Sequence, residues 1–489
     1  MVAGTGVKGL DDILNGGLTS HRLHLVEGDP GAGKTTLAIQ FLLEGQRLGE
    51  RGLYITLSET EQELREGAQS HGWSLEGIDI FELKAVEQRS LGGDVSLFHP
   101  GEVELGEAMK TLLEEVNRVD PARVVFDSLS EIRLLAQQAL RYRRQILALK
   151  QHFANKKCTV LLLDDRTAEA HDKQVMSIAH GAIELEQSSP AYGNERRRVR
   201  IAKMRGRAYR GGFHDYTITT GGLRVFPRLV AAFTRDLPDK PVQRVSSDNA
   251  ELDKMLGGGL IRGTSTLIAG PPGSGKSSIA ATFAIGAADR GELAIIYLFD
   301  ENPHTFVTRS LALGLDPRPH ILSGKLVLQQ IDPAELTPGE FVNAVRDRVD
   351  EGARFVAIDS LNGYINAMPE ETFLQVLLHE LLTYLAQRET LAFLVTPQHG
   401  FVGPLESRID VSYLADNVIV TRYFEARGGV HNAISVMKQR SSAHEKTIRE
   451  FTIGAGGLTV GKPLSAFRGV LGGTPEYSGE DDDLFLGAK

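Results

Sequence analysis

The sequence is poor in cysteine and has no long apolar run. Its 489 residues include one cysteine, Cys158, which excludes an internal disulfide and a four-cysteine zinc site. Because Cys158 opens the apolar run 158–163, we expect a small core residue rather than a reactive thiol. The longest apolar runs, such as 293–299 and 391–395, have the length of strands and are too short for a membrane span. The first residues resemble no signal peptide, so we expect a soluble, cytoplasmic protein.

The chain also lacks a positive net charge. It has 54 Lys and Arg residues against 63 Asp and Glu residues, a net charge of −9. A protein that coats nucleic acid is expected to be basic, so nucleic acid is a disfavoured partner, although a local basic patch is not excluded. The chain is 42% hydrophobic and 24% charged, which is ordinary for folded proteins and excludes disorder throughout.

An internal repeat divides the chain. The segment 10–14 recurs as 252–256 and the glycine-rich segment 28–35 recurs as 270–277, each 242 residues later. This period is too long for a solenoid and indicates a duplicated domain. We predict a first domain at 1–228, a linker at 229–245, a second domain at 246–462, and a C-terminal loop with an acidic disordered tail at 463–489.

Apolar runs alternate with helical patterns within each copy. In the first copy we expect strands at 22–27, 52–57, 123–126 and 159–163 and an amphipathic helix at 34–45. Apolar strands separated by helices predict an α/β fold with a mainly parallel twisted sheet and helices on both faces. The sequence therefore predicts two tandem nucleotide-binding domains.

The pattern G-x-x-x-x-G-K-[ST] occurs in both copies, each time between a predicted strand and a predicted helix. Such P-loops cradle phosphates with backbone N–H groups at a helix N-terminus. We expect Lys34 and Lys276 to reach the β- and γ-phosphates, and Thr35 and Ser277 to offer a hydroxyl to Mg²⁺. The ATP-binding residues predicted in this way are Gly28, Asp29, Pro30, Gly31, Ala32, Gly33, Lys34, Thr35, Thr36, Gly270, Pro271, Pro272, Gly273, Ser274, Gly275, Lys276, Ser277 and Ser278.

Acidic residues follow predicted strands in both copies. Asp127 and Asp359 are candidate Mg²⁺ ligands, because strand ends in such sheets border the ligand crevice. Glu59, Asp300 and Glu301 are candidates for positioning water or accepting a proton. The alternative for these three is a solvated acid at a helix N-terminus.

A basic stretch at 196–207 allows three interpretations: a nucleic-acid patch, a solvated strand face, or cations that act on a neighbour's phosphates. Lys203 and Arg205 recur as Lys438 and Arg440 without the surrounding arginines. This recurrence favours the phosphate role.

The tandem P-loop arrangement resembles the KaiC family of circadian clock proteins and their bacterial and archaeal relatives. The resemblance rests on 4–18, 246–260 and 445–451 together with the Lys-x-Arg pairs. It implies RecA-like domains and an ATP-dependent homohexamer of two stacked rings. ATP then lies between subunits, so Lys203, Arg205, Lys438 and Arg440 would act in trans. Candidate partners are a KaiB-like protein or a histidine kinase.

The resemblance also implies an ATPase in the first domain and an autokinase and autophosphatase in the second. The family's Ser-Thr acceptor pair falls on Ser412 and Tyr413, so a tyrosine replaces the threonine. The paired glutamates become Ser58-Glu59 and Asp300-Glu301.

We therefore expect Glu59 to position water and Asp300 or Glu301 to activate Ser412, in a clock-type or signalling regulator. Two other classes stay open: a DNA-dependent ATPase of the RecA or DnaB type on the same fold, and an ATP-assembled scaffold without turnover.

Overall fold

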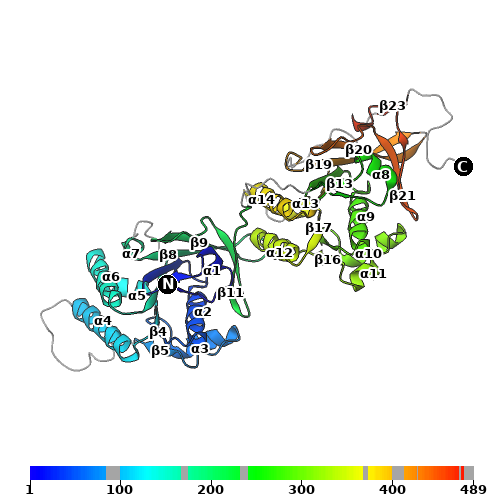
Figure 1. Ribbon diagram of the computed structural model, residues 1–489. Helices are drawn as coiled ribbons and strands as arrows, with labels where there is room; N and C mark the ends of the chain where they lie inside the picture. Colours follow the sequence, from blue (N-terminus) through cyan, green and yellow to red (C-terminus); the bar gives the residue numbers. More distant parts are fainter. Residues whose placement is uncertain are drawn as a thin grey trace. The chain divides into compact units, whose positions relative to one another are not determined.

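The computed structural model describes residues 1–83, 100–166, 174–231, 241–366, 373–398, 412–426, 428–472 and 475–477. The chain divides into two compact units, Met1–Arg228 and Leu229–Lys489. Each unit is built around one nine-stranded sheet (Figure 1). Most of the predicted linker and the acidic end of the predicted tail lie outside the described residues.

The first unit has the strand order β11-β10-β9-β8-β3-β7-β6-β4-β5. Pairs from β8 to β5 are parallel, and β9 to β11 extend the sheet as antiparallel neighbours. Its strands are β3 (Leu23–Gly28), β4 (Gly52–Thr56), β5 (Asp79–Glu82), β6 (Arg123–Asp127), β7 (Thr159–Asp165), β8 (Gly181–Ser188), β9 (Arg196–Met204), β10 (His214–Thr219) and β11 (Gly222–Phe226), with a separate pair β1 (Val2–Ala3) and β2 (Leu18–Thr19). Its helices are α1 (Leu10–Ile13), α2 (Lys34–Arg47), α3 (Glu61–Ser70), α4 (Pro100–Val119), α5 (Leu129–Ala136), α6 (Ala139–Ala154) and α7 (Gln174–Ile178).

The second unit repeats this plan in the order β16-β15-β17-β18-β14-β19-β20-β21-β22. Its strands are β14 (Ser265–Gly270), β15 (Leu293–Leu298), β16 (Leu326–Gln330), β17 (Ala353–Asp359), β18 (Leu391–Pro397), β19 (Asn417–Ala426), β20 (Gly429–Gln439), β21 (Arg449–Gly454) and β22 (Gly457–Pro463), with the separate pairs β12 (Arg244–Val245) with β13 (Leu260–Ile261) and β23 (Phe467–Arg468) with β24 (Glu476–Tyr477). Its helices are α8 (Ala250–Met255), α9 (Lys276–Asp289), α10 (Pro303–Ala312), α11 (Arg318–Leu322), α12 (Pro338–Asp350), α13 (Leu361–Asn366), α14 (Leu374–Gln387) and the 3₁₀ turn η2 (Val470–Gly472).

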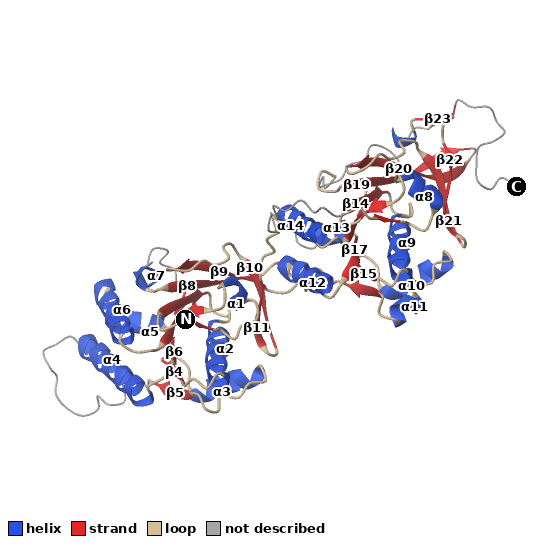
Figure 2. Cartoon of the chain, viewed as in Figure 1, coloured by secondary structure: helices blue, strands red, loops and turns tan. Residues whose placement is uncertain are grey.

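Helices cover both faces of each sheet (Figure 2). Each unit accordingly has two large apolar clusters, and the alternate side chains of the central strands divide between them. The α/β architecture predicted from the sequence, with mainly parallel sheets and flanking helices, is confirmed. The expected strands of the first copy and the expected helix after its P-loop are present.

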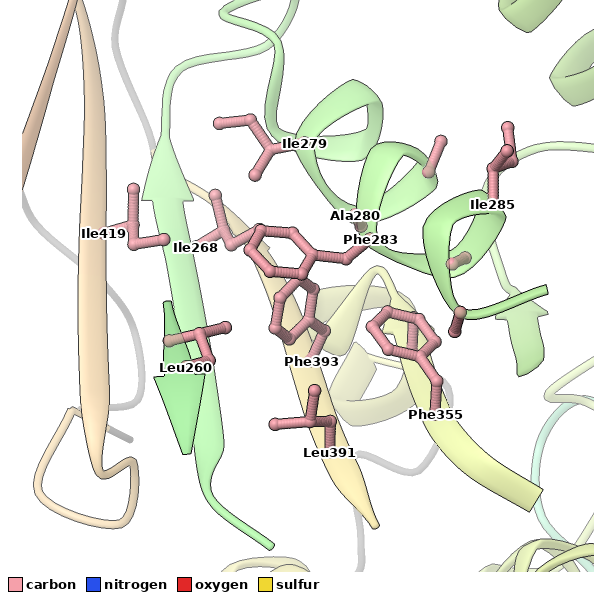
Figure 3. Close-up of a cluster of buried hydrophobic side chains, with 14 of the residues drawn as sticks. Leu260, Ile268, Ile279, Ala280, Phe283, Ile285, Phe355, Leu391, Phe393 and Ile419 are labelled. Carbon is pink, nitrogen blue, oxygen red and sulfur yellow. The ribbon is translucent and has the colours of Figure 1, made fainter. Parts of the chain in front are cut away.

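The helix that follows the second P-loop is fixed by aromatic packing. Phe283 on α9 contacts Phe393 on β18 edge to face, with ring centroids 4.9 Å apart, and Phe355 on β17 contacts Phe393 at 5.0 Å (Figure 3). Edge-to-face pairs add to the free energy gained by burying the rings. This packing holds the middle of α9 against β17 and β18.

Three further expectations can be compared with the structure. Cys158 is buried, and burial raises the pKa of its thiol to about 12, as suits an unreactive core residue. No helix in the described part of the chain combines the length and the apolar character needed to cross a membrane. In the predicted C-terminal loop, Leu464 and Val470 pack against Phe424 and continue the folded part, while the disordered acidic tail stays a prediction.

Candidate functional site

Each P-loop joins a buried strand to a long helix through a glycine whose positive φ angle would strain any other residue. Gly33 and Gly275 precede α2 and α9 with φ angles of 90° and 91°. A Cβ atom on Gly33 would lie 2.5 Å from Ile218, and one on Gly275 would lie 2.2 Å from Ile453. No side chain caps the first turn of either helix, so its N–H groups remain available to an anion such as a phosphate.

The two P-loop lysines have different surroundings. Lys34 Nζ donates to the Gly28 carbonyl (2.9 Å) and forms an ion pair with Asp165 Oδ1 (2.8 Å). Lys276 Nζ donates to the Pro271 carbonyl (2.7 Å). Pro397, at the end of β18, holds the place that Asp165 has at the end of β7. Burial lowers the pKa of Lys276 to about 8.

The expected metal ligands lie together in each unit. Thr35 Oγ1 donates to Asp127 Oδ2 (3.0 Å), and Ser277 lies close enough to Asp359 to lower the pKa of its carboxyl in part. Burial raises the pKa of both aspartates above the ordinary value. A hydroxyl beside a carboxylate, with room for phosphate oxygens, is a ligand set that Mg²⁺ accepts, so these residues fit the implied ion.

Tyr54 is a site residue that sequence reasoning missed. Its hydroxyl donates to Asp127 in a short hydrogen bond, and its counterpart in the second unit is Ile296. Tyr54 resembled an ordinary strand residue in the sequence. Only the pairing of β4 with β6 brings it to the aspartate.

The strand-end acids are held differently in the two units. The Thr56 hydroxyl donates to the Glu59 carbonyl (2.7 Å) and accepts from its N–H (3.0 Å), which fixes the backbone of Glu59. Partial burial, Asp127 and Glu63 raise the pKa of the Glu59 carboxyl. In the second unit the Ser360 hydroxyl donates to Asp300 in a short hydrogen bond.

Glu301 is engaged by an arginine from the following helix. Arg309 binds the Glu301 carboxylate through Nη2 (2.8 Å) and Nε (3.2 Å). Arg309 also donates through Nη1 to Ser278 Oγ (3.3 Å) on the first turn of α9. Sequence reasoning missed Arg309, although it is the residue that neutralises one of the predicted carboxylates.

The Lys-x-Arg cations lie at the opposite edge of each sheet from that unit's own P-loop. Lys203 pairs with the start of β8, and Lys438 with the start of β19, whereas each P-loop follows the end of a parallel strand. Lys203 Nζ donates to the Met176 carbonyl (2.6 Å), and Arg205 to the Ser177 carbonyl (2.9 Å). The structure therefore does not bring these cations to the nucleotide site of their own unit.

The predicted acceptor segment is bound by the second pair of cations. Lys438 Nζ donates to the Ser412 carbonyl (2.8 Å), and Arg440 Nη2 donates to the Tyr413 carbonyl (2.6 Å). Ser412 lies just before β19, at the strand-start edge of the sheet, whereas Asp300 follows the end of β15. One copy of the second unit therefore does not bring its own Ser412 and Asp300 together.

Two other arginines of the basic stretch, Arg198 and Arg200, are engaged within the first unit. Arg200 Nε pairs with Glu184 (2.5 Å) across the β8–β9 ladder, and Arg198 Nη2 lies 3.7 Å from Glu186. Both guanidinium groups also stack over the Phe213 ring, at 5.0 and 5.1 Å. Cross-strand ion pairs of this kind reduce the positive potential that nucleic acid would need.

Two α/β units, each with a P-loop, a hydroxyl–aspartate pair and strand-end acids, define a tandem RecA-like P-loop ATPase. The family model described as KaiC ATPase matches residues 3–230 and again 246–465. The chain belongs to this KaiC family of ATPases.

Curated relatives match over nearly the full length. The circadian clock protein KaiC3 of a Synechocystis species is 27% identical over 489 residues, which cover 98% of this chain and 95% of that protein. The circadian clock oscillator protein KaiC of a Picosynechococcus species is 28% identical, covering 98% and 93%. The protein of that name from Synechococcus elongatus is 29% identical, covering 96% and 91%.

Proposed function

We propose that this chain binds and hydrolyses ATP in both units and transfers a phosphoryl group to its own Ser412. The observation that carries the proposal is the duplicated pairing of a P-loop hydroxyl with a strand-end aspartate, Thr35 with Asp127 and Ser277 with Asp359. Family membership supports the ATPase part. Thr35, Asp127, Ser277 and Asp359 would hold Mg²⁺, which supplies positive charge to the phosphate oxygens.

At the first site, this chain supplies charge and orientation. Lys34 and the N–H groups at the start of α2 bind the phosphates, and Glu59 orients the attacking water and accepts a proton from it. The raised pKa of Glu59 suits a proton acceptor near neutral pH.

At the second site, the Ser412 hydroxyl oxygen attacks the γ-phosphorus of ATP. Its proton passes to the Asp300 carboxylate, the bond from the γ-phosphorus to the bridging oxygen breaks, and ADP leaves. Because Ser412 and Asp300 lie at opposite edges of one sheet, the transfer proceeds between neighbouring subunits of a homohexamer. Lys438 lies at the same edge of the sheet as Ser412 and would approach the nucleotide of the neighbouring subunit. Lys203 would approach a neighbour's nucleotide in the first ring in the same way.

By analogy with the relatives named as clock proteins, we propose that phosphorylation makes this chain a clock-type or signalling regulator. A KaiB-like protein or a histidine kinase is the class of partner that such a regulator would contact.

Nucleotide content and phosphate release test the ATPase part. Lys34→Ala and Lys276→Ala should each remove about half of the bound nucleotide, because each lysine serves one of two sites. Lys8 is exposed, so Lys8→Ala is a charge-matched control that should bind as much nucleotide as the unmodified chain. A variant that keeps full stoichiometry would show that its site was misassigned. ATP hydrolysis that DNA stimulates would favour the DNA-dependent class. A ring that forms but hydrolyses no ATP would favour the scaffold class.

Intact-mass and peptide analysis after incubation with Mg·ATP tests the kinase part. Ser412→Ala should abolish the label, whereas Ser323→Ala, at an exposed serine, should keep it. Mixing unlabelled Lys276→Ala subunits with Ser412→Ala subunits should restore some label if transfer occurs between subunits. Label on Tyr413 alone would contradict the assignment of Ser412.

A further inference from the structure

Gly67 on α3 and Arg309 on α10 occupy equivalent positions. Both helices begin after a strand-end glutamate, and Thr60 and Asn302 cap them by accepting from the N–H three residues on. The eighth residue after the glutamate is Gly67 in the first unit and Arg309 in the second. This position is therefore one of those at which the two nucleotide sites differ.

In the second unit, Arg309 joins the strand-end acid to the P-loop helix. Its guanidinium forms a two-point ion pair with Glu301 and reaches Ser278 on α9. The side chains of Arg309 and Glu301 are 29% and 21% exposed, so water only partly screens the pair. Two-point arginine–carboxylate pairs are the strongest of their kind, and Arg309 engages both oxygens of the Glu301 carboxylate.

In the first unit, the corresponding space is open. A cavity of about 360 Å³ lies beside Thr36, Glu59 and Gly67. Thr36 and Glu59 are the counterparts of Ser278 and Glu301, the two residues that Arg309 joins. A Cβ atom on Gly67 would meet no atom within 4 Å, so the missing side chain leaves room beside Glu59 for water.

We propose that the residue at this position assigns different reactions to the two sites. Arg309 is a positioning residue that keeps Glu301 from activating water, so that ATP at the second site is reserved for a hydroxyl acceptor. Gly67 leaves Glu59 accessible to the attacking water of the first site. This inference rests on the proposed ATPase and kinase activities.

The first test moves the arginine into the first unit. In a Lys276→Ala background, Gly67→Arg should lower kcat for phosphate release by about tenfold or more, a part of the usual contribution of a general base. The KM for ATP should change little, because the phosphate-binding groups are untouched. Gln69→Arg adds the same charge on an exposed position of α3 and should keep the parental kcat.

The second test removes the arginine from the second unit. In a Lys34→Ala background, Arg309→Gly should raise phosphate release several-fold and lower the Ser412 label. Arg309→Lys keeps the positive charge but cannot form the two-point ion pair. Its rate of phosphate release should therefore lie between those of the parent and of Arg309→Gly. Guanidinium ion at millimolar concentration, added to Arg309→Gly, should restore slow release. A merely structural role of Arg309 predicts no such rescue.

The outcomes separate this inference from the proposed function. If the Lys276→Ala parent releases no phosphate, the proposed ATPase function of the first site fails. If that parent turns over and Gly67→Arg turns over equally well while still binding ATP, the role of this position is refuted. Unchanged phosphate release in Arg309→Gly, with an unchanged Ser412 label, refutes the inference for the second site.

Discussion

Replacing Asp165 by asparagine should tighten nucleotide binding at the first site. The Asp165 carboxylate lies 2.8 Å from the Lys34 ammonium, where it would compete with the phosphates for that cation. Once nucleotide is bound, the same carboxylate faces the phosphate charge. Asparagine keeps the shape and a hydrogen-bonding oxygen for Ser130, which lies 3.4 Å from the Asp165 carboxylate, and removes only the charge.

The size of the effect follows from the charge and exposure of the pair. Two unit charges at about 4 Å interact by about 4 kcal/mol at an effective dielectric constant near 20 and by about 1 kcal/mol in water. The Asp165 side chain is 33% exposed, so we expect the lower part of this range, about 1.5–2 kcal/mol. This corresponds to a dissociation constant about 10- to 30-fold smaller.

Fluorescence titration with a labelled nucleotide in a Lys276→Ala background isolates the first site. The matched control is Asp120→Asn, because Asp120 is 86% exposed and lies 3.6 Å from Lys156 in a loose pair. The control removes the same charge and should leave the dissociation constant within about twofold. Unchanged or weaker binding in Asp165→Asn would refute the competition argument and assign Asp165 a supporting role toward the nucleotide.

Further predictions concern pH and stability. Because the pKa of Lys276 is about 8, its charge is lost as pH rises through 8. Nucleotide binding at the second site, measured in a Lys34→Ala background, should then weaken by up to about tenfold per pH unit, and Lys276→Arg should remove this dependence. Because the pKa of Glu59 is raised, hydrolysis at the first site should fall on acidification at a higher pH than for an ordinary glutamate, and Glu59→Gln should abolish hydrolysis. Phe283→Ala should lower the unfolding free energy of the second unit by about 3–5 kcal/mol in a denaturant titration, whereas Phe373→Ala, at a side chain 66% exposed, should cost less than about 0.5 kcal/mol.

The architecture was predictable because local patterns and the repeat agree. Each P-loop requires a strand before it and a helix after it, and the duplication made the second copy a check on the first. The antiparallel extension, β9 to β11 in the first unit, was not predicted, because its first strand carries the basic stretch 196–207. That stretch looked like a charged surface until its cross-strand partners in β8 were known. The apolar residues beyond 463 were too few to indicate packing.

The site residues that belong to a sequence motif were predictable. Those that reach the site only through the order of the strands in the sheet were not. Parallel strands end at one edge of a sheet, so Thr35 and Asp127 were expected to meet, and they lie 3.0 Å apart. Tyr54 reaches the site because β4 pairs with β6, and Asp165 because β7 pairs with β3, an order that no local pattern encodes. Arg309 carried a usable signal, since the constant offset between the copies sets it against Gly67.

Two of the differences between the two sites alter the charge beside the P-loop. In the first, Asp165 occupies the P-loop lysine and Glu59 faces an open cavity. In the second, Pro397 leaves Lys276 without that carboxylate, and Arg309 pairs with Glu301 beside the P-loop helix. Phosphates bind more tightly where cations are unopposed, and water is activated where a carboxylate is accessible. On the proposed function, we therefore expect the first site to favour turnover and the second to hold ATP for transfer.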